Sequence, residues 1–357
     1  MTTAVAEGGW PKTTRAWTYG NASAGLEKSL SRNDEAALPP QKSALSPTSV
    51  LVQVMYMSIN PADYKLAELG LLARPMISPP ATPGMDFSGR VVLAGASMDT
   101  YRPGQLVFGR VDPNKYGTLA EYVVVKNGDC LAHVPEGHET QLAEFASVGT
   151  CGLTAWQSIK PYLPDNAKDT KIFINGGSGG LGTFAIQIGK ALGCHVTTSC
   201  SGGNVELCRS LGADEVIDYK TQNISEVLKS KGKVFQLVVD NVGCSPANEE
   251  DLYVAANTFM KEDGHFIQVG GGVNKDMFKA MVRRSLVPGF LGGGKRQWKF
   301  IMTAQSHVDL ESIGELIKSG AVKPVLDEQF TFDNAPKAYE KLKTGRTKGK
   351  IVVKVSE

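Results

Sequence analysis

The sequence lacks the features that mark secreted, membrane-spanning or nucleic-acid-binding proteins. Its six cysteines form no Cys-x-x-Cys pair, which favours reduced thiols over a disulfide framework. No stretch approaches the roughly 20 apolar residues that a membrane helix needs. The formal net charge is only +2, so nucleic acid is not expected as the main partner. The N-terminal segment lacks the apolar core of a secretory signal and is poor in arginine. We expect a cytoplasmic protein, with a short mitochondrial presequence as the alternative.

The chain is long enough for two domains, and its first part has the pattern of a β-domain. It has 357 residues, of which 42% are hydrophobic and 21% charged, as in ordinary globular proteins. Short alternating stretches between turn residues occur at 49–59, 89–95, 105–111 and 120–126. This spacing predicts an irregular β-barrel or sandwich. The last residues, which end in a further apolar stretch, are expected to rejoin this domain as a strand.

From residue 151 onward, short apolar strands alternate with helices. The helices are expected at 183–193 and 204–213. The strands are expected at 171–176, 195–200, 215–219, 235–243 and 265–271. Such alternation predicts βαβ units around a parallel sheet.

The strongest motif in the chain is a G-x-G-x-x-G turn between the strand at 171–176 and the helix that follows. Glycine is needed in such a turn because the backbone is tight and must approach a pyrophosphate without a Cβ between them. The helix then presents N–H groups and its positive dipole end to the phosphates. We therefore expect a dinucleotide to bind the six residues of the motif, Gly177, Ser178, Gly179, Gly180, Leu181 and Gly182.

The end of the next strand indicates which dinucleotide is bound. NAD-binding folds usually place an acid there to hold the ribose 2′-OH. Here the strand ends without an acid, and hydroxyl and amide donors can hydrogen-bond a 2′-phosphate. NADPH is therefore the expected cofactor, and a polar loop with no ligand role is the alternative. The polar end of this strand comprises Thr198, Ser199, Cys200, Ser201, Gly202, Gly203 and Asn204.

In these and further motifs the sequence resembles the medium-chain dehydrogenase/reductase superfamily, in its quinone-oxidoreductase and enoyl-reductase branches. Fungal trans-acting enoyl reductases are the most similar group. The resemblance covers nearly the whole chain, and its specificity comes from the order and spacing of motifs that are each loose. Besides the glycine turn, these motifs stand at 59–63, 83–89, 117–122, 152–155, 211–214, 218–219 and 345–355.

The resemblance implies an α/β fold with two domains and an active site in the cleft between them. A GroES-like β-barrel domain would comprise 1–150 and 325–357, and a Rossmann-type domain with a doubly wound parallel sheet would comprise 151–324. The 2′-phosphate would lie among Ser201, Asn204 and Tyr219, although many relatives carry lysine where Asn204 stands. The further residues expected around the cofactor are Asn60, Asp63, Thr154, Ser199, Gly202, Gly203, Val269, Gly270, Gly271, Phe290, Leu291 and Gly292.

The residues that the resemblance aligns with zinc ligands do not suit zinc, so no metal is expected. Catalytic zinc takes about three ligands from Cys, His or carboxylate. The aligned positions hold Asn60, Met85 and Thr150, with Cys151 one residue out of register. The four-cysteine lobe of the zinc branch is also missing, because residues 90–129 contain no cysteine.

Without a Lewis acid, conjugated acceptors are favoured over simple ketones, because they are more electrophilic. The resemblance implies that Tyr64 and Lys65 take part in catalysis. Tyr64 could donate a proton, and fungal relatives carry a lysine at the position of Lys65. The alternative for each is that Tyr64 packs and Lys65 neutralises a cofactor phosphate. Asp63 is expected to cap backbone N–H groups rather than to act as a base.

The leading hypothesis is an NADPH-dependent oxidoreductase of the enoyl or quinone reductase type, acting on an enone, a quinone or an acyl thioester. A trans-acting enoyl reductase that partners a polyketide synthase is the sharper variant. A non-catalytic, crystallin-like NADPH-binding protein is the alternative from another class. The chain is expected to be a monomer or a homodimer.

Overall fold

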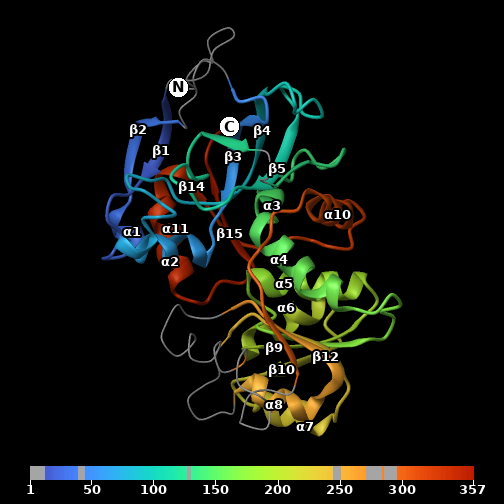
Figure 1. The fold of residues 1–357 in the computed structure, drawn as a ribbon. Helices are drawn as coiled ribbons and strands as arrows, with labels where there is room; N and C mark the ends of the chain where they lie inside the picture. Colours follow the sequence, from blue (N-terminus) through green and yellow to red (C-terminus); the bar gives the residue numbers. More distant parts are fainter. Residues whose placement is uncertain (1–12, 39–44, 127–129, 244–250, 271–283, 285–295) are drawn as a thin grey trace. The chain divides into compact units, whose positions relative to one another are not determined.

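The computed structural model describes residues 13–38, 45–126, 130–243, 251–270, 284 and 296–357 (Figure 1). The chain divides into two compact units. Unit 1 comprises residues 1–150, 305–318 and 324–357, and unit 2 comprises 151–304 and 319–323. Segment 305–318 thus lies with unit 1, whereas the sequence placed it in the second domain. The domain boundaries expected from the sequence otherwise stay a prediction.

Unit 1 is built around a seven-stranded sheet with the order β14-β15-β3-β4-β5-β7, in which β6 also pairs with β3. The long central strand β3 pairs with β15 through its last residues and with β6 through its first five. The C-terminal strand therefore returns to the N-terminal part of the chain, as predicted. The strand bounds are β3 Ser49–Ser58, β4 Asp86–Ala94, β5 Leu106–Arg110, β6 Tyr122–Lys126, β7 Cys130–His133, β14 Leu326–Thr331 and β15 Lys350–Lys354.

The remaining elements of unit 1 are a two-stranded sheet and short helices around the main sheet. The antiparallel pair β1 and β2 had no counterpart in the sequence prediction. One core cluster joins these parts, with side chains such as Phe87 and Met57 fully buried. The bounds are β1 Thr13–Thr18, α1 Leu26–Ser29, β2 Ser31–Ala37, α2 Pro61–Glu68, η1 Gly70–Ala73, α3 Leu142–Ala146, α10 His307–Lys318, η5 Phe332–Asn334 and α11 Ala335–Lys343.

Unit 2 contains a six-stranded sheet in the order β10-β9-β8-β11-β12-β13, and every pair of neighbours is parallel. The central strands are apolar runs, which is typical of strands covered on both faces. The order reverses between β8 and β11, where ligands bind in doubly wound folds. The bounds are β8 Lys171–Asn175, β9 His195–Cys200, β10 Glu215–Asp218, β11 Phe235–Asp240, β12 Met260–Gln268 and β13 Gln297–Phe300.

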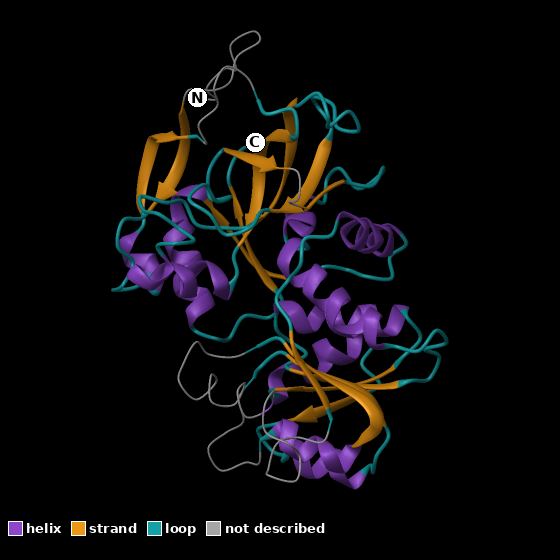
Figure 2. Ribbon diagram, viewed as in Figure 1, coloured by secondary structure: helices purple, strands orange, loops and turns teal. Residues whose placement is uncertain are grey.

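Helices cover both faces of this sheet. Figures 1 and 2 show α5 and α6 on one side and α7 and α8 on the other. Helix α5 is buried over most of its length, and the chain leaves it at Gly193 with a φ of 87°, a conformation that favours glycine. Within the described residues, no helix has the length and apolarity to cross a membrane. The bounds are α4 Gly149–Ile159, η2 Lys160–Tyr162, α5 Gly180–Ala191, η3 Gly202–Asn204, α6 Val205–Ser210, α7 Ile224–Ser230 and α8 Leu252–Phe259.

The structure confirms the α/β class and the parallel sheet. The predicted strands all form, although β4 begins three residues earlier than expected and β12 five residues earlier. Helix α5 also begins three residues before the expected start, because the helix opens inside the glycine motif and not after it. The sequence had no signal for β13, α2 or α10 as separate elements.

Candidate functional site

The glycine motif forms the turn between β8 and α5, and the glycines at its three fixed positions, Gly177, Gly179 and Gly182, have different surroundings. A Cβ on Gly177 would lie 2.2 Å from Oγ1 of Thr198, and one on Gly182 would lie 2.1 Å from the carbonyl oxygen of Gly176. A Cβ on Gly179 would have only the Gly176 oxygen near it, at 3.9 Å. The first and third glycines are thus required by packing, whereas the second leaves open space. This is the arrangement in which a pyrophosphate approaches the second glycine.

The first turn of α5 is free to receive an anion. Gly179 stands at the N-cap with extended backbone, and no side chain of the described residues caps the helix. The first i to i−4 hydrogen bond runs from the N–H of Thr183 to the carbonyl of Gly179, at 3.0 Å. The N–H groups of Gly180, Leu181 and Gly182 precede it, at the positive end of the helix dipole. This end therefore suits the phosphates of a dinucleotide.

Ser199 supports the glycine turn from beneath. Its side chain is buried, donates to Oδ1 of Asn175 at 2.6 Å and accepts the N–H of Gly176 at 3.0 Å. Its carbonyl accepts the N–H of Gly177 at 2.8 Å. The sequence placed Ser199 among the cofactor contacts, but the structure places it behind the turn as a positioning residue.

Thr154, a further residue that the sequence placed near the cofactor, is also buried. Its Oγ1 lies 2.6 Å from Oγ1 of Thr303.

Polar side chains at the end of β9 meet the glycine turn. Nδ2 of Asn204 donates to Oγ of Ser178 and to Oγ of Ser201, both at 3.1 Å. Gly202 and Gly203 are exposed beside them. Tyr219 is 47% exposed, and its N–H donates to the carbonyl of Cys200 at 3.1 Å, which places it at the same edge of the sheet. The structure thus brings the predicted 2′-phosphate residues together at the carboxyl ends of β9 and β10.

A carboxylate lies at the same edge and was missed by the sequence analysis. Asp218 ends β10, and its Oδ2 lies 2.6 Å from the position of a Cβ on Gly202. Its Oδ1 accepts the N–H of Lys220 at 2.9 Å. The acid-free end of β9 is therefore bordered by an acid from the neighbouring strand. This position could be found only from the parallel pairing of Asp218 with Cys200.

A second missed residue stands where the strand order reverses. Asn241 follows β11, and both polar atoms of its side chain are buried without a hydrogen-bond partner among the described residues. A Cβ on Gly270 would lie 1.9 Å from the carbonyl oxygen of Asn241, so the backbone of β12's end runs close to it. The N–H groups of Val269 and Gly270 donate to the carbonyl of Asp240. Gly271, Phe290, Leu291 and Gly292 lie outside the described residues.

In unit 1, a network of buried charges surrounds Asp86, which is fully buried. Its carboxylate accepts hydrogen bonds from the Asn60 amide at 2.8 Å, the Ser58 hydroxyl at 3.2 Å and both the N–H and the hydroxyl of Thr150 at 2.8 and 2.6 Å. The ammonium of Lys350, which is 3% exposed, lies 3.7 Å from Asp86 Oδ2 and donates to Oδ1 of Asn60 at 2.5 Å. These contacts fix the start of α2 to the last strand.

This network occupies the positions that align with zinc ligands. The buried Arg110 guanidinium donates to the Thr150 hydroxyl at 3.2 Å, to the sulfur of Met85 at 3.7 Å and to Asp112 at 2.9 Å. A metal ion here would meet two fixed cations, and its nearest donors would be one carboxylate, that of Asp86, with an amide, a thioether and a hydroxyl, which is fewer than the three Cys, His or carboxylate ligands that zinc takes. Within the described residues, no three His, Cys, Asp or Glu side chains come together as metal ligands. The residues present do not fit zinc.

Asp63 caps the start of α2, as the sequence predicted. Its Oδ2 accepts the N–H of Asn60 at 2.7 Å, and the Asn60 side chain caps the N–H of Asp63 in return. Burial raises the pKa of the Asp63 carboxyl to about 7, against the opposing effect of the Asn60 hydrogen bond. Its Oδ1 is buried with no partner among the described residues. Asn60 and Asp63 thus act within unit 1 and hold α2 in place.

The two predicted catalytic side chains stand on α2. Tyr64 is half-buried, and the ammonium of Lys343 lies 5.1 Å from its ring centroid. Burial raises the pKa of the Tyr64 hydroxyl, and the nearby Glu68 adds to this effect. Lys65 is partly exposed. The ring of Tyr64 packs against the core of unit 1, and the roles of Tyr64 and Lys65 stay predictions.

Two family models match the chain. Residues 46–136 match the model described as "Alcohol dehydrogenase GroES-like domain", and residues 211–353 match the model described as "Zinc-binding dehydrogenase". The first lies in unit 1, and the second spans the end of unit 2 and the returning C-terminal segment.

Full-length relatives and solved structures agree with these models. The chain is 47% identical to the trans-enoyl reductase pgmF of Aspergillus terreus, over 97% of this chain and 98% of that protein. It is 35% identical to the human mitochondrial NAD(P)H oxidoreductase RTN4IP1, over 87% and 82% of the two chains. The fold is similar to that of the quinone oxidoreductase from Coxiella burnetii, with a TM-score of 0.79, 24% identity and coverage of 97% and 100%.

Proposed function

This chain belongs to the medium-chain dehydrogenase/reductase superfamily, in its enoyl reductase and quinone oxidoreductase branch, and we propose that it uses NADPH to reduce an activated C=C bond or a quinone without a metal ion. It is an oxidoreductase with a nicotinamide cofactor. The main support for the proposal is that the buried side chains of Asp86, Lys350 and Arg110 form a hydrogen-bonded charge network at the positions that align with zinc ligands. A site without a Lewis acid suits acceptors whose conjugation already makes them electrophilic.

In this proposal the residues of the chain bind and orient, and the bound cofactor supplies the hydride. The glycine turn and the first N–H groups of α5 would hold the pyrophosphate, and Asn241 would offer its unpartnered amide to the ligand at the switch point. Fixed positioning of two reactants can replace a large share of the activation barrier. Tyr64 or water would deliver the proton, and Lys65 would bind a phosphate or ribose oxygen.

The preference for NADPH is proposed from the donors at the end of β9. Asn204, Ser178 and Ser201 form a hydrogen-bonded group that can donate to a 2′-phosphate. NADH is the second candidate, and the specific observation that favours it is the Asp218 carboxylate beside Gly202. A carboxylate there could accept a ribose 2′-OH and would repel a 2′-phosphate.

The cofactor experiment compares dissociation constants of NADPH and NADH for the wild type and two variants. Ser201→Asp is expected to weaken NADPH at least tenfold and to change NADH little. Asp218→Asn is expected to strengthen NADPH modestly. Equal affinity of the wild type for both cofactors would contradict the NADPH proposal. A loss of NADH affinity in Asp218→Asn would support the second candidate.

We propose an enone, a quinone or an acyl thioester as the substrate. The acyl thioester variant, with a polyketide synthase as partner, draws support from the name of the Aspergillus relative. NADPH consumption with a panel of the three classes tests it, and a strong preference for thioesters attached to a carrier protein would single out this variant. No consumption with any class would favour a non-catalytic binding protein. Location in the cytoplasm and a monomeric or dimeric state stay predictions.

The roles of Tyr64 and Lys65 are tested by separating turnover from binding. Tyr64→Phe is expected to lower turnover by roughly a hundredfold or more if the hydroxyl donates the proton, since general acids contribute about 10²–10⁴-fold. Lys65→Ala is expected to act mainly on the dissociation constant of NADPH. An unchanged turnover in Tyr64→Phe would assign the tyrosine to packing against Lys343.

A further inference from the structure

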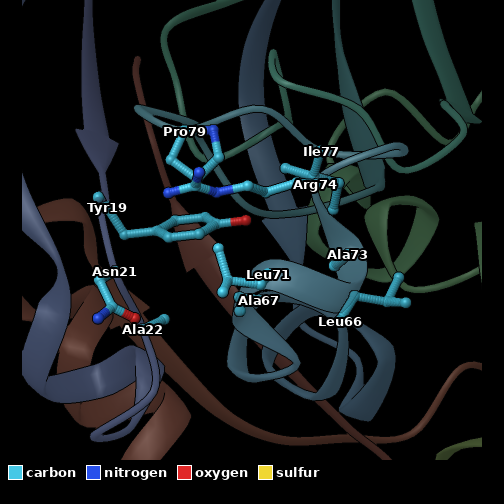
Figure 3. Close-up of a pocket in the computed structure, with 12 residues that line it drawn as sticks. Tyr19, Asn21, Ala22, Leu66, Ala67, Leu71, Ala73, Arg74, Ile77 and Pro79 are labelled. Atoms are coloured by element: carbon cyan, nitrogen blue, oxygen red, sulfur yellow. The ribbon is translucent and has the colours of Figure 1, made fainter.

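A pocket of about 120 Å³ lies within unit 1 and contains none of the predicted cofactor or catalytic residues (Figure 3). One wall is the segment after β1, from Tyr19 to Ala22, and the other is formed by the end of α2 and by η1. Both walls are fixed in place. Tyr19 and Ala81 exchange backbone hydrogen bonds of 2.9 and 3.0 Å, and the N–H of Leu26 donates to the Glu68 carboxylate at 2.9 Å.

The pocket combines one cation with one hydroxyl. Arg74 is the single charged side chain among the described residues that line it. Its guanidinium makes no hydrogen bond or ion pair with any described residue, as is also true of the exposed Arg102 and Arg346 of this unit, whereas Arg15, Arg32 and Arg110 are ion-paired. Figure 3 shows the Arg74 side chain extending across the pocket toward Tyr19. Arg74 is exposed, and a cation at the edge of a pocket that has no carboxylate partner suits an anion.

Tyr19 supplies the second polar contact. The residue is 4% exposed, yet its ring forms part of the pocket wall. Burial, assisted by the negative charge of Asp63, raises the pKa of its hydroxyl to about 12. The hydroxyl therefore keeps its proton at physiological pH and can donate it to an acceptor. The Glu68 carboxylate at the end of α2 is ion-paired with Lys343 and does not line the pocket.

Apart from the side-chain amide of Asn21, the other side chains that line the pocket are apolar. Leu66, Ala67, Leu71, Ala73 and Ile77 contribute side chains to the lining. The volume is close to that of cavities that hold a molecule of the size of benzene, about 150 Å³. A ligand that fits would thus pair one anionic group with a short hydrocarbon part.

From these observations we propose that the pocket binds a small organic carboxylate with a short apolar tail. The carboxylate accepts hydrogen bonds from Arg74 and from the Tyr19 hydroxyl, and the tail packs against Leu66 and Ile77. Guanidinium groups match carboxylates in geometry and remain charged at all relevant pH values. The proposal does not rest on the reductase function, because the pocket lining contains none of the residues proposed to bind the cofactor or to act in catalysis.

The experiment titrates the full chain with hexanoate and benzoate and follows binding by calorimetry and by amide chemical shifts. Hexanoate is expected to bind at least tenfold more tightly than hexanol, which has the tail without the charge. Arg74→Gln is expected to weaken hexanoate at least tenfold, and Tyr19→Phe several-fold. The control is Arg346→Gln, an exposed arginine of unit 1 outside the pocket, which should bind hexanoate like the wild type.

Three results would overturn the proposal. These are hexanol binding as tightly as hexanoate, Arg74→Gln binding hexanoate like the wild type, and shifted amides that lie away from the segment after β1 and from α2–η1. The same titration with saturating NADPH separates this site from the proposed active site. Retained hexanoate binding supports the pocket, and complete competition assigns the carboxylate to the cofactor or substrate site instead.

Discussion

Replacing Lys350 by methionine tests whether the buried charges of unit 1 act as one network. Methionine has a similar length but removes the ammonium, which donates to the carbonyl of Ile59 at 3.1 Å and to Asn60 at 2.5 Å and lies 3.7 Å from Asp86. Asp86 would keep its hydrogen bonds from neutral donors and lose its nearest cation. The variant thus leaves a fully buried carboxylate without its ion-pair partner.

The expected cost follows from this burial. Removing one partner of a buried ion pair destabilises a protein by about 3–5 kcal/mol, since the remaining charge is uncompensated. Exposed pairs contribute only about 0–1 kcal/mol. Lys354→Met is the matched control, because Lys354 stands on the same strand, has a side chain 34% exposed and pairs with the exposed Glu357. We expect a loss of about 3–5 kcal/mol for Lys350→Met and at most about 1 kcal/mol for Lys354→Met.

Urea unfolding measures the free energies, and hydrogen exchange of the β3 and β15 amides assigns the loss to unit 1. The double variant Asp86→Asn with Lys350→Met should be more stable than the sum of the two single changes predicts, since it removes both charges. The network hypothesis fails if Lys350→Met and Lys354→Met cost the same, or if the two single changes are additive.

Two further predictions concern the glycine turn and Asp63. Gly179→Val should fold normally, because a Cβ at this position meets open space, and should lose NADPH binding, because the side chain fills the space of the pyrophosphate. Gly182→Val should unfold unit 2, because its Cβ would lie 2.1 Å from the carbonyl oxygen of Gly176. Circular dichroism measures the folding of each variant, and fluorescence titration measures its NADPH binding. The pKa of Asp63 is raised from 3.8 to about 7 in the folded state, so the folded chain binds the extra proton between these values. Stability from this group is therefore lost as pH rises from about 4 to about 7, by at most about 4 kcal/mol. Asp63→Asn should flatten that window in pH-dependent unfolding relative to the exposed Asp99→Asn, and an identical pH dependence of the two variants would refute the assignment.

The sequence predicted those parts of the fold and site that local spacing determines. The glycine turn is one example, because the glycines of its G-x-G-x-x-G pattern lie within six residues that directly follow an apolar strand. The parallel sheet of unit 2 is another, since buried parallel strands are continuous apolar runs. The cap formed by Asp63 also depends on neighbours three residues away.

Features that depend on distant residues could not be predicted. Lys350 and Asn60 form a hydrogen bond across 290 positions, and nothing in either local sequence indicates the other. Asp218 approaches the cofactor region only because β10 pairs with β9. Ser199 was assigned to the cofactor from its position at a strand end, but its buried hydroxyl donates to Asn175, a residue 24 positions away that the local sequence does not indicate.

The charge network also explains how this part of unit 1 can fold without zinc and without zinc ligands. A divalent metal at this place would balance buried acidic groups, and here Lys350 and Arg110 supply the positive charge from the chain itself. Both cations are at most 5% exposed and already donate to protein acceptors. A cation whose donors are occupied cannot polarise a substrate oxygen as a metal with an open position does. One metal ion could both stabilise the fold and activate a substrate oxygen, whereas Lys350 and Arg110 do only the first. The proposed chemistry is therefore confined to acceptors that need no Lewis acid.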